Sequence, residues 1–315
     1  MAGANLPAKI YKKTTPTELR LIFDFEEDET GGFIDIAQCL SALNRRFYRQ
    51  GLYYYVNSIE VQNSEDGYVD LSVIPDTWMT QQAHKRAFRS YQEMNAQSDT
   101  PRPKYHDFKV FMDTTHRNNI NGMIYNKMPI TMGALGNIRT MQSDEWVYSQ
   151  FVSASGEDRP EGSPNQWNVH MVGDHQGTYP TSFSSVGLIQ SYKDSRTLPP
   201  MYGEPEVAPD NNIDPIHRLF ESGDVAHVEE ISQHLDIYND TTPYDRDNYV
   251  GQNDNDLIPL TRLATSESIG RTAEVKGACV PFGLIRVSSS DYNSTWRLIL
   301  NIAPGTYHGV YAERV

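Results

Sequence analysis

Strict alternation of apolar and polar residues near both ends of the chain constrains the fold more than any other feature. In residues 18–25 (ELRLIFDF), the apolar positions are Leu19, Leu21, Phe23 and Phe25. In residues 296–302 (WRLILNI), they are Trp296, Leu298, Leu300 and Ile302. A period of two is that of a strand with one buried face. We therefore predict half-buried strands at both ends of the chain.

Further strands are predicted between these two. Residues 52–62 and 68–74 are rich in aromatic and β-branched side chains, and they flank NSEDG, an Asp-Gly turn that predicts a hairpin. Other strand candidates lie at residues 106–113, 145–152, 166–173 and 279–290. Nineteen tyrosines and many glycines and prolines are typical of short strands joined by long loops. These features predict a mainly β protein with sandwiches or barrels of the jelly-roll kind.

Three segments change to helical spacing. The first is residues 33–50, where three arginines near the C-terminal end would complement the helix dipole and Gly51 would end the helix. The second is residues 77–95, in which we expect Trp78, Phe88 and Tyr91 to pack the helix. The third is residues 224–238, with Asp224 as N-cap.

Polar tracts suggest how the chain divides. Residues 1–17 carry Lys9, Lys12 and Lys13 without an acidic residue, and they predict a short basic arm. Residues 155–165, within SASGEDRPEGSPN, are the strongest boundary candidate, as a linker or an exposed loop. The chain shows no internal sequence repeat.

Charge and cysteine usage disfavour several classes of protein. The net charge of −14 argues against tight binding of duplex nucleic acid, which needs clustered Lys and Arg. Cys39 and Cys279 lie far apart and form no metal-binding spacing, so we expect free thiols and a cytosolic folding compartment. No window approaches 18 apolar residues and no signal pattern opens the chain. We therefore expect a protein that is neither exported by that route nor membrane-spanning.

Candidate metal ligands are scattered. His170 and His175 flank Asp174 without a recognised metal spacing, and the pair His227 and His234 lacks the HExxH pattern. Residues 210–221 match four positions of a calcium loop, but Pro215 replaces the required glycine. Looser binding of structural calcium by acidic loops stays open. The candidate ligands are Asp210, Asp214, Asp245, Asp247, Asp254 and Asp256.

Signatures of common enzymes do not stand out. The sequence has no nucleophile elbow, P-loop or dinucleotide fingerprint, and the glycine-rich MGALGN at residues 132–137 is more simply a turn. We therefore expect a protein that is not an enzyme and has no cofactor other than the calcium considered above.

Basic side chains are local in this acidic chain. Lys9, Lys12 and Lys13 in the arm are one group, and the second helix carries the other, namely Lys85, Arg86 and Arg89. Either group would meet an internal genome or acidic lipid headgroups. The alternative is a solvated arm and a solvated helix edge.

Two segments carry a resemblance to a known family. IPDTWMTQQAHKRAFRSYQEMNAQ followed by PRPKYHDFKVFMD, and the closing FGLIRVSSSDYNSTWRLILNIAPGTYHGVYAERV, resemble segments of capsid proteins of small icosahedral DNA viruses. In length and layout the chain is most similar to major capsid proteins of lipid-containing, single-stranded DNA phages of the Flavobacterium-infecting type.

This resemblance implies a double jelly roll, with barrels at residues 18–160 and 161–315. It implies homotrimers of pseudo-hexameric outline that assemble, in the host cytoplasm, into a virion shell over an internal membrane or the genome. Other capsid proteins, such as penton or minor proteins, would be partners, and no small-molecule substrate is implied. A single jelly roll with a projecting domain stays open. Alternatives in function are a minor capsid, spike or tail component of a phage, or a two-barrel enzyme that is metal-dependent or carbohydrate-active.

Overall fold

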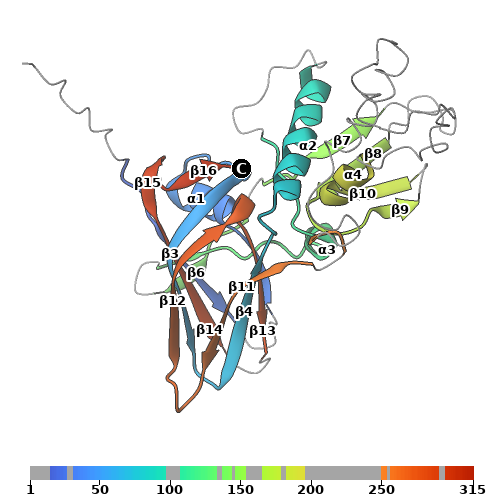
Figure 1. Cartoon of the computed structure of the whole chain (residues 1–315). Coiled ribbons are helices and arrows are strands. Elements are labelled where there is room, and N and C mark those ends of the chain that lie inside the picture. The colour runs from blue at the N-terminus through green and yellow to red at the C-terminus, as the bar shows by residue number, and fades with distance from the viewer. Residues whose placement is uncertain are drawn as a thin grey trace, which may run out of the picture. The chain divides into compact units, whose positions relative to one another are not determined.

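The computed structural model describes a mainly β protein with four α-helices among the described residues (Figure 1). The described residues are 15–26, 31–96, 107–132, 137–143, 146–153, 165–178, 182–195, 250–253, 256–290 and 295–315. The chain divides into two compact units, residues 1–191 with 250–315, and residues 192–249. Of the second unit only residues 192–195 are described. The account below concerns the first unit.

A five-stranded and a four-stranded antiparallel sheet face each other across the main core. One has the order β1 (Arg20–Phe25), β14 (Trp296–Ile302), β3 (Leu52–Asn63) and β12 (Thr272–Val280). The other has the order β11 (Ile258–Thr265), β4 (Gly67–Val73), β13 (Leu284–Ser289) and β2 (Gly31–Asp35). β16 (Ala312–Arg314) also pairs with β3, and β15 (Pro304–Tyr307) precedes it. We call this pair of sheets the sandwich.

The chain changes sheet at almost every step along the sandwich. β1 and β2, β3 and β4, β11 and β12, and β13 and β14 each place consecutive strands in opposite sheets. The predicted hairpin of residues 52–74 is therefore wrong in its pairing, although both strands exist. β3 pairs with β12, β14 and β16, whereas β4 pairs with β11 and β13. An Asp-Gly turn reverses the chain, but it does not decide whether the second strand pairs with the first or crosses to the other sheet.

The alternation at the two ends of the chain forms one shared core. β1 and β14 pair directly, with Phe25 opposite Trp296, and their rings stack with centroids 3.7 Å apart. Leu21, Phe23 and Leu298 are buried on the same face. The outward face carries a bidentate cross-strand ion pair between Asp24 and Arg297, with N–O distances of 2.6 and 2.9 Å. The predicted half-buried strands at both ends are thus confirmed.

The helices agree with the sequence in part. α1 (Ile36–Asn44) is shorter than the predicted residues 33–50, because Gly31–Asp35 is strand β2 and Arg45 takes a left-handed conformation with φ of 53°. The arginines therefore follow the helix instead of lying in its last turn. α2 (Trp78–Ala96) matches its prediction. Within α2, Tyr91 is buried, but Trp78 is 42% exposed and so is not the packing residue that we expected.

A long insertion separates β4 from β11. It contains α2, α3 (Thr114–Asn121), α4 (Leu188–Ser195), a small hairpin of β5 (Ile130–Met132) and β6 (Ile138–Thr140), and a four-stranded sheet. That sheet has the order β7 (Gln150–Ser153), β8 (Asn165–His170), β10 (Ser182–Gly187) and β9 (Gln176–Thr178), with β8 and β10 parallel. The strand expected at residues 106–113 is reduced to a bridge from Phe111 to His170.

Strands from both sides of the expected boundary at residue 160 share both sheets of the sandwich, since β1–β4 pair with β11–β14. The expected linker at residues 155–165 and the expected helix at residues 224–238 lie outside the described residues, except Asn165 at the start of β8. No helix among the described residues combines the length and apolar character needed to cross a bilayer. Both thiols are free, Cys39 buried and Cys279 half-buried.

A buried carboxylate ties the insertion to the sandwich. Asp35, fully buried, caps α1 by accepting from the Gln38 N–H at 3.1 Å. Its other oxygen accepts from Gln50 Nε2 at 2.9 Å and from Trp146 Nε1 at 3.0 Å. Gln50 in turn accepts from the backbone N–H of Val110 at 2.6 Å. Because Trp146 and Val110 belong to the insertion, this one side chain joins three segments.

Burial of this carboxyl changes its proton affinity. Loss of hydration raises the pKa of Asp35 from 3.8 to about 6, although its hydrogen bonds act in the opposite direction. Two buried histidines of the insertion behave differently. Burial lowers the pKa of both His84 and His116 to about 4, so both are neutral near pH 7.

Replacing Trp296 tests whether the paired terminal strands hold the core. Trp296 is 1% exposed and stacked on Phe25, so Trp296→Ala should lower the free energy of unfolding by about 3–5 kcal/mol. The matched control, Trp78→Ala, removes a side chain that is 42% exposed and should cost less than about 1 kcal/mol. Urea unfolding followed by circular dichroism measures both. Equal losses would contradict this account of the core.

Asp35→Asn tests the buried carboxyl through pH. The pKa of Asp35 is higher in the folded protein than its ordinary value, so protonation between pH 6 and 4 favours the folded state of the wild type. Asparagine cannot take up that proton, whereas all other titrating groups are common to both proteins. The difference in unfolding free energy should therefore shift by about 2.4 kcal/mol in favour of the wild type as the pH falls from 7 to 4. A constant difference would show that Asp35 does not titrate as described.

Candidate functional site: an arginine-lined pocket

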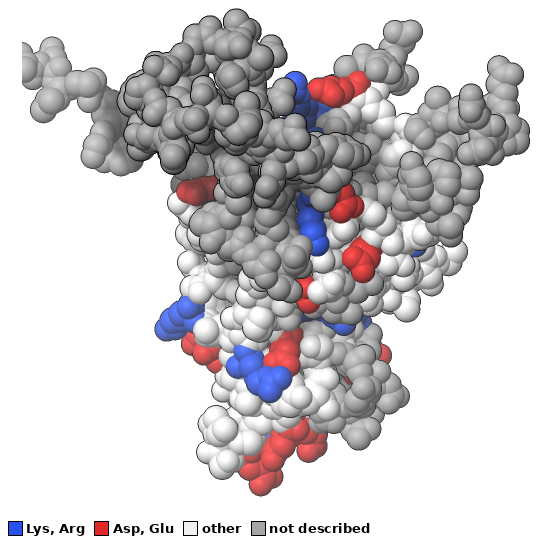
Figure 2. All heavy atoms as spheres, turned by 45° about the vertical axis from the view of Figure 1, so that its right-hand side comes forward, with Lys and Arg blue, Asp and Glu red and all other residues white. Residues whose placement is uncertain are grey.

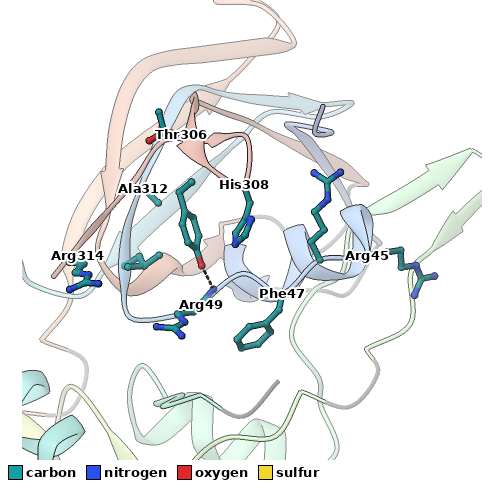
Figure 3. A pocket seen from close by; sticks show the side chains of 10 residues that line it. Arg45, Phe47, Arg49, Thr306, His308, Ala312 and Arg314 are labelled. Carbon is teal, nitrogen blue, oxygen red and sulfur yellow. Dashed lines mark hydrogen bonds between the residues drawn. The ribbon is translucent and has the colours of Figure 1, made fainter. Parts of the chain in front are cut away.

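A pocket of about 800 Å³ opens at one end of the sandwich (Figure 3). Its wall comes from the loop between α1 and β3 and from the β15–β16 hairpin. The lining residues are Arg45, Arg46, Phe47, Arg49, Leu52, Thr306, Tyr307, His308, Ala312 and Arg314. We call it the arginine pocket.

Local backbone geometry brings the two walls together. The chain leaves α1 at Arg45 and enters β3 at Leu52, while His308, with φ of 51°, turns the β15–β16 hairpin. Tyr48 is fully buried between them and donates to the carbonyl of His308 at 2.9 Å. The N–H of Arg49 donates to the Tyr307 hydroxyl at 3.0 Å, the bond drawn in Figure 3. The pocket is therefore held by the buried Tyr48 and the half-buried Tyr307 as well as by strand pairing.

The N-terminal segment enters the protein beside this pocket. Thr17 Oγ1 donates to the carbonyl of His308 at 2.7 Å, and Arg46 donates to the carbonyl of Pro16 at 3.0 Å. A Cβ atom at Gly309, where φ is 98°, would overlap Thr17, so glycine permits this close approach. Lys9, Lys12 and Lys13 lie outside the described residues.

The pocket is basic in an acidic chain. Four of its lining side chains are arginines, in a chain with a net charge of −14. Nearby carboxylates are engaged locally: Glu18 accepts from the backbone N–H of Arg20 at 3.3 Å, and Glu313 accepts from the Tyr311 hydroxyl at 2.6 Å. Burial raises the pKa of Tyr307 although Arg49 opposes the shift, so the hydroxyl stays protonated.

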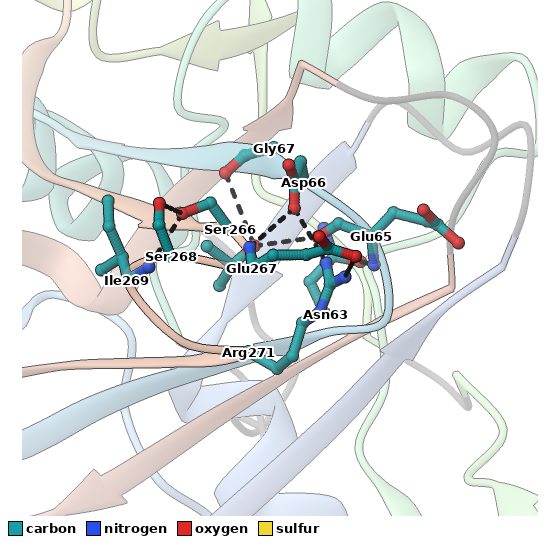
Figure 4. A network of polar contacts seen from close by, with 10 residues as sticks. Asn63, Glu65, Asp66, Gly67, Ser266, Glu267, Ser268, Ile269 and Arg271 are labelled. Carbon is teal, nitrogen blue, oxygen red and sulfur yellow. Dashed lines mark hydrogen bonds and ion pairs between the residues drawn. The ribbon is translucent and has the colours of Figure 1, made fainter.

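The opposite end of the sandwich is acidic. β3 runs from Leu52, which lines the arginine pocket, to Asn63, which lies in the network of Figure 4. At about 3.3 Å per residue, β3 spans roughly 36 Å. In this network Arg271 pairs with Asp66 at 2.9 Å and with Glu267 at 3.4 Å, and the backbone N–H of Glu65 donates to Asn63 at 3.2 Å.

Figure 2 shows acidic side chains gathered at the lower tip of the molecule in that view. Because β1 ends at Phe25 opposite Trp296, and Trp296 pairs with Asn63, Glu26 also lies at this end. We call this end, defined by Glu26, Glu65, Asp66 and Glu267, the acidic tip. The sandwich therefore has charge of opposite sign at its two ends.

The pocket has the chemistry of an anion site. A guanidinium presents N–H donors in a planar fork that suits phosphate and carboxylate oxygens, and clustered arginines also supply positive potential. The rings of Phe47, Tyr307 and His308 add flat apolar surface. In Figure 3, Phe47 and His308 lie between Arg45 and Arg49. This combination suits the binding of a ligand that carries a phosphate or carboxylate group beside a flat ring.

The basic residues predicted on α2 are placed elsewhere. Lys85, Arg86 and Arg89 are exposed, and Arg89 pairs with Glu93 at 3.0 Å. The lining of the arginine pocket does not include them. Their expected contact with a genome or headgroups stays a prediction.

The predicted metal ligands do not converge among the described residues. Asp256 accepts from the backbone and side-chain nitrogens of Asn253, both at 3.2 Å, and so caps a turn. His170 is buried, 2.6 Å from Ser185 Oγ through Nδ1 and 3.1 Å from the carbonyl of Asp174 through Nε2. The part of the chain that the structure describes holds no group of three or more His, Cys, Asp or Glu placed to bind a metal ion. The other predicted ligands lie outside the described residues, namely Asp210, Asp214, Asp245, Asp247, Asp254, His227 and His234.

Sequence reasoning noted the arginines of the pocket but gave them another role. Arg45, Arg46 and Arg49 were expected to complement a helix dipole, and Arg314 and His308 were not singled out. The sequence signal for this site was the cluster of three arginines in RRFYR, at residues 45–49 of an acidic chain. Its partner hairpin is distant in sequence and meets it through tertiary contacts, namely the β3–β16 pairing and the hydrogen bonds of Tyr48 and Arg49.

Comparison with protein-family models, curated proteins and solved structures finds no match for this chain.

Stabilisation by pyrophosphate tests the arginine pocket as an anion site. A ligand that binds only the folded protein raises its melting temperature by mass action. Millimolar pyrophosphate should therefore raise the melting temperature of the wild type. The double variant Arg45→Gln with Arg49→Gln should lose most of this increase. Arg262→Gln with Arg271→Gln removes the same charge outside the pocket and should retain it. Equal increases in both double variants would contradict an anion site here.

Proposed function

We propose that this chain is a viral capsid protein that self-assembles into an icosahedral shell. The observation that carries the proposal is the strand order of the sandwich. Taken in chain order, the eight strands divide as first, eighth, third and sixth in one sheet and second, seventh, fourth and fifth in the other. This is the order of a jelly roll, an architecture common in viral capsid proteins. Fold alone does not determine function, so the features below add to it.

We propose a single jelly roll with a long insertion between its fourth and fifth strands. The eight strands come from residues 20–73 and 258–302, which supports one roll closed by both ends of the chain. The insertion, with its parallel β8–β10 pair, would form the projecting domain. A double roll would instead require a second set of eight strands within the insertion.

The interior of the sandwich supports a structural role over that of a cupin-type enzyme. Enzymes of that kind bind metal and substrate inside the barrel. Here the space between the sheets is filled by large apolar side chains, among them Phe23, Tyr54, Leu71, Ile285 and Trp296. A rigid, filled sandwich is suited to a subunit that repeats by symmetry.

The charge polarity supports an orientation in the shell. The arginine pocket, with Pro16 and Thr17 beside it, occurs at one end of the sandwich, and the acidic tip occurs at the other. We propose that the basic end faces the interior, where a genome or anionic lipid supplies negative charge. The acidic tip would then face outward.

An exposed apolar surface supports contacts between subunits. On the β5–β6 hairpin, Met132 is 78% exposed and lies directly opposite Ile138, which is 53% exposed. Ile124 and Tyr125, 63% and 59% exposed, lie along the same insertion. Large exposed apolar side chains in a cluster mark interaction sites more often than free surface. We call Met132 and Ile138 the apolar hairpin and propose that a neighbouring subunit covers it.

Negative-stain electron microscopy of the purified chain, with and without millimolar calcium, tests the function. Closed shells support the proposal, and isolated six-sided trimers would favour the double roll. Met132→Ser with Ile138→Thr should leave the melting temperature within a few degrees of wild type and sharply reduce the fraction of shells in sedimentation. Ile269→Thr, which changes an isoleucine that is 73% exposed elsewhere, should assemble like the wild type. Monomers of the wild type under every condition would contradict the function.

A further inference from the structure

We propose that the arginine pocket binds single-stranded nucleic acid, with phosphates on the arginines and an unpaired base against the rings of Phe47 and His308. The inference deepens the proposed function and rests on it for its biological meaning, because a shell that packages a genome must contact it. The binding itself is a property of the isolated chain and can be tested without assembly.

The first step is charge. Nonspecific binding of a nucleic-acid strand comes mainly from cations that displace counterions from phosphates. Arg45, Arg49 and Arg314 are exposed at the pocket, and Arg46 is half-buried with its Nη1 on Pro16 and Thr17. A guanidinium has five N–H donors, so the contacts of Arg46 leave it able to donate to further oxygens. Four arginines thus concentrate positive charge around one pocket in a chain with a net charge of −14.

The second step is the aromatic surface. Tyr307 is fixed by its bond to Arg49 and packs against His308 with centroids 4.8 Å apart. Phe47 is half-buried, with its ring 6.2 Å from that of Trp146 and 5.5 Å from Lys109 Nζ. Rings held at the mouth of a basic groove are the usual platform for bases of a single strand. A simple anion site would not need them.

The third step is shape. A pocket of about 800 Å³ falls within the range of small-molecule sites, about 300–1,000 Å³, and so is large enough for a nucleotide. In a duplex the bases are stacked inside and cannot enter a concave site without being flipped out. An unpaired strand exposes its bases at no such cost. The geometry therefore favours single-stranded over duplex nucleic acid.

A competing occupant is the acidic tip of a second copy. Its carboxylates would satisfy the arginines, but they offer nothing for the rings to stack on. In the present structure Asp66 and Glu267 are already engaged by Arg271. These observations favour nucleic acid and make the acidic tip an outcome of the test.

Fluorescence anisotropy of a labelled oligothymidylate, titrated with the full-length chain at several salt concentrations, is the test. Phe47→Leu should weaken binding about tenfold, which is the loss expected for one stacked base. Arg45→Gln with Arg49→Gln should reduce the slope of log K against log salt by about 1.4, or roughly 0.7 for each phosphate contact on a single strand. Arg262→Gln with Arg271→Gln should change neither quantity. Duplex of the same length should bind more weakly.

Three results would overturn the inference. In the first, Phe47→Leu and the Arg45→Gln, Arg49→Gln double variant bind the strand as tightly as the wild type, and binding is lost only when Lys9, Lys12 and Lys13 are all replaced by Gln. The arm alone would then be the site. The second is equal competition by oligoglutamate, which would indicate an acidic protein segment. The third is no binding at all. If shells form but the chain does not bind the strand, this inference is refuted and the proposed function still holds. If the chain binds the strand but forms no shells, the proposed function is refuted and the binding inference still holds.

Discussion

Strand β14 lies between β1 and β3, and this pairing of the two ends of the chain determines how the rest of the structure is arranged. It closes one sheet through Phe25 and Trp296, whose rings stack across the pair. It also brings the N-terminal segment against the hairpin that follows β14, through Thr17 and His308. Because the rolled strands come from both ends of the chain, the long middle segment must leave and re-enter between β4 and β11. The sandwich is thus built from the two ends of the chain, and the insertion connects its fourth and fifth strands.

The charge distribution follows from the same topology. Because successive strands reverse direction, the turn after α1 and the β15–β16 hairpin meet at one end, and the turns after β1, β3 and β11 meet at the other. The first pair of loops carries the arginines, and the second set carries the carboxylates. The two ends of β3 therefore lie in regions of opposite charge, which is the polarity that the proposed orientation uses. The buried carboxylate of Asp35 then fixes the insertion relative to the basic end, because Gln50 precedes β3 directly.

The sequence predicted local structure well and long-range pairing poorly. The alternation in residues 18–25 and 296–302 was sufficient to identify two strands, because burial of one sheet face imposes a period of two. Neither segment contains a pattern that indicates that these two strands pair with each other. The Asp-Gly turn at residues 66–67 indicated a reversal, but the crossing between sheets depends on β12 and β13. The helix at residues 33–50 was overextended, because Phe47 continues the apolar spacing after Arg45 has already turned the backbone.

The candidate site was harder to predict for the same reason. A basic cluster at residues 45–49 is visible in the sequence, yet its meaning depends on Tyr307, His308 and Arg314, which reach it through tertiary contacts. The buried role of Asp35 was also hidden, because its partners Gln50 and Trp146 are separated from it along the chain. For the predicted metal ligands, closeness in sequence was misleading. His170 lies near Asp174 and His175 in sequence, but in the fold its two ring nitrogens hydrogen-bond to Ser185 and to a backbone carbonyl.

A cryo-electron microscopy reconstruction of particles assembled from the purified chain tests the central claim most directly. The account predicts a closed shell built from the eight-stranded sandwich, with the arginine pocket on the inner surface, the acidic tip directed outward and the apolar hairpin covered by a neighbour. A shell with the arginine pocket on its outer surface would contradict the proposed orientation. A chain that stays monomeric under every assembly condition would contradict the capsid function itself.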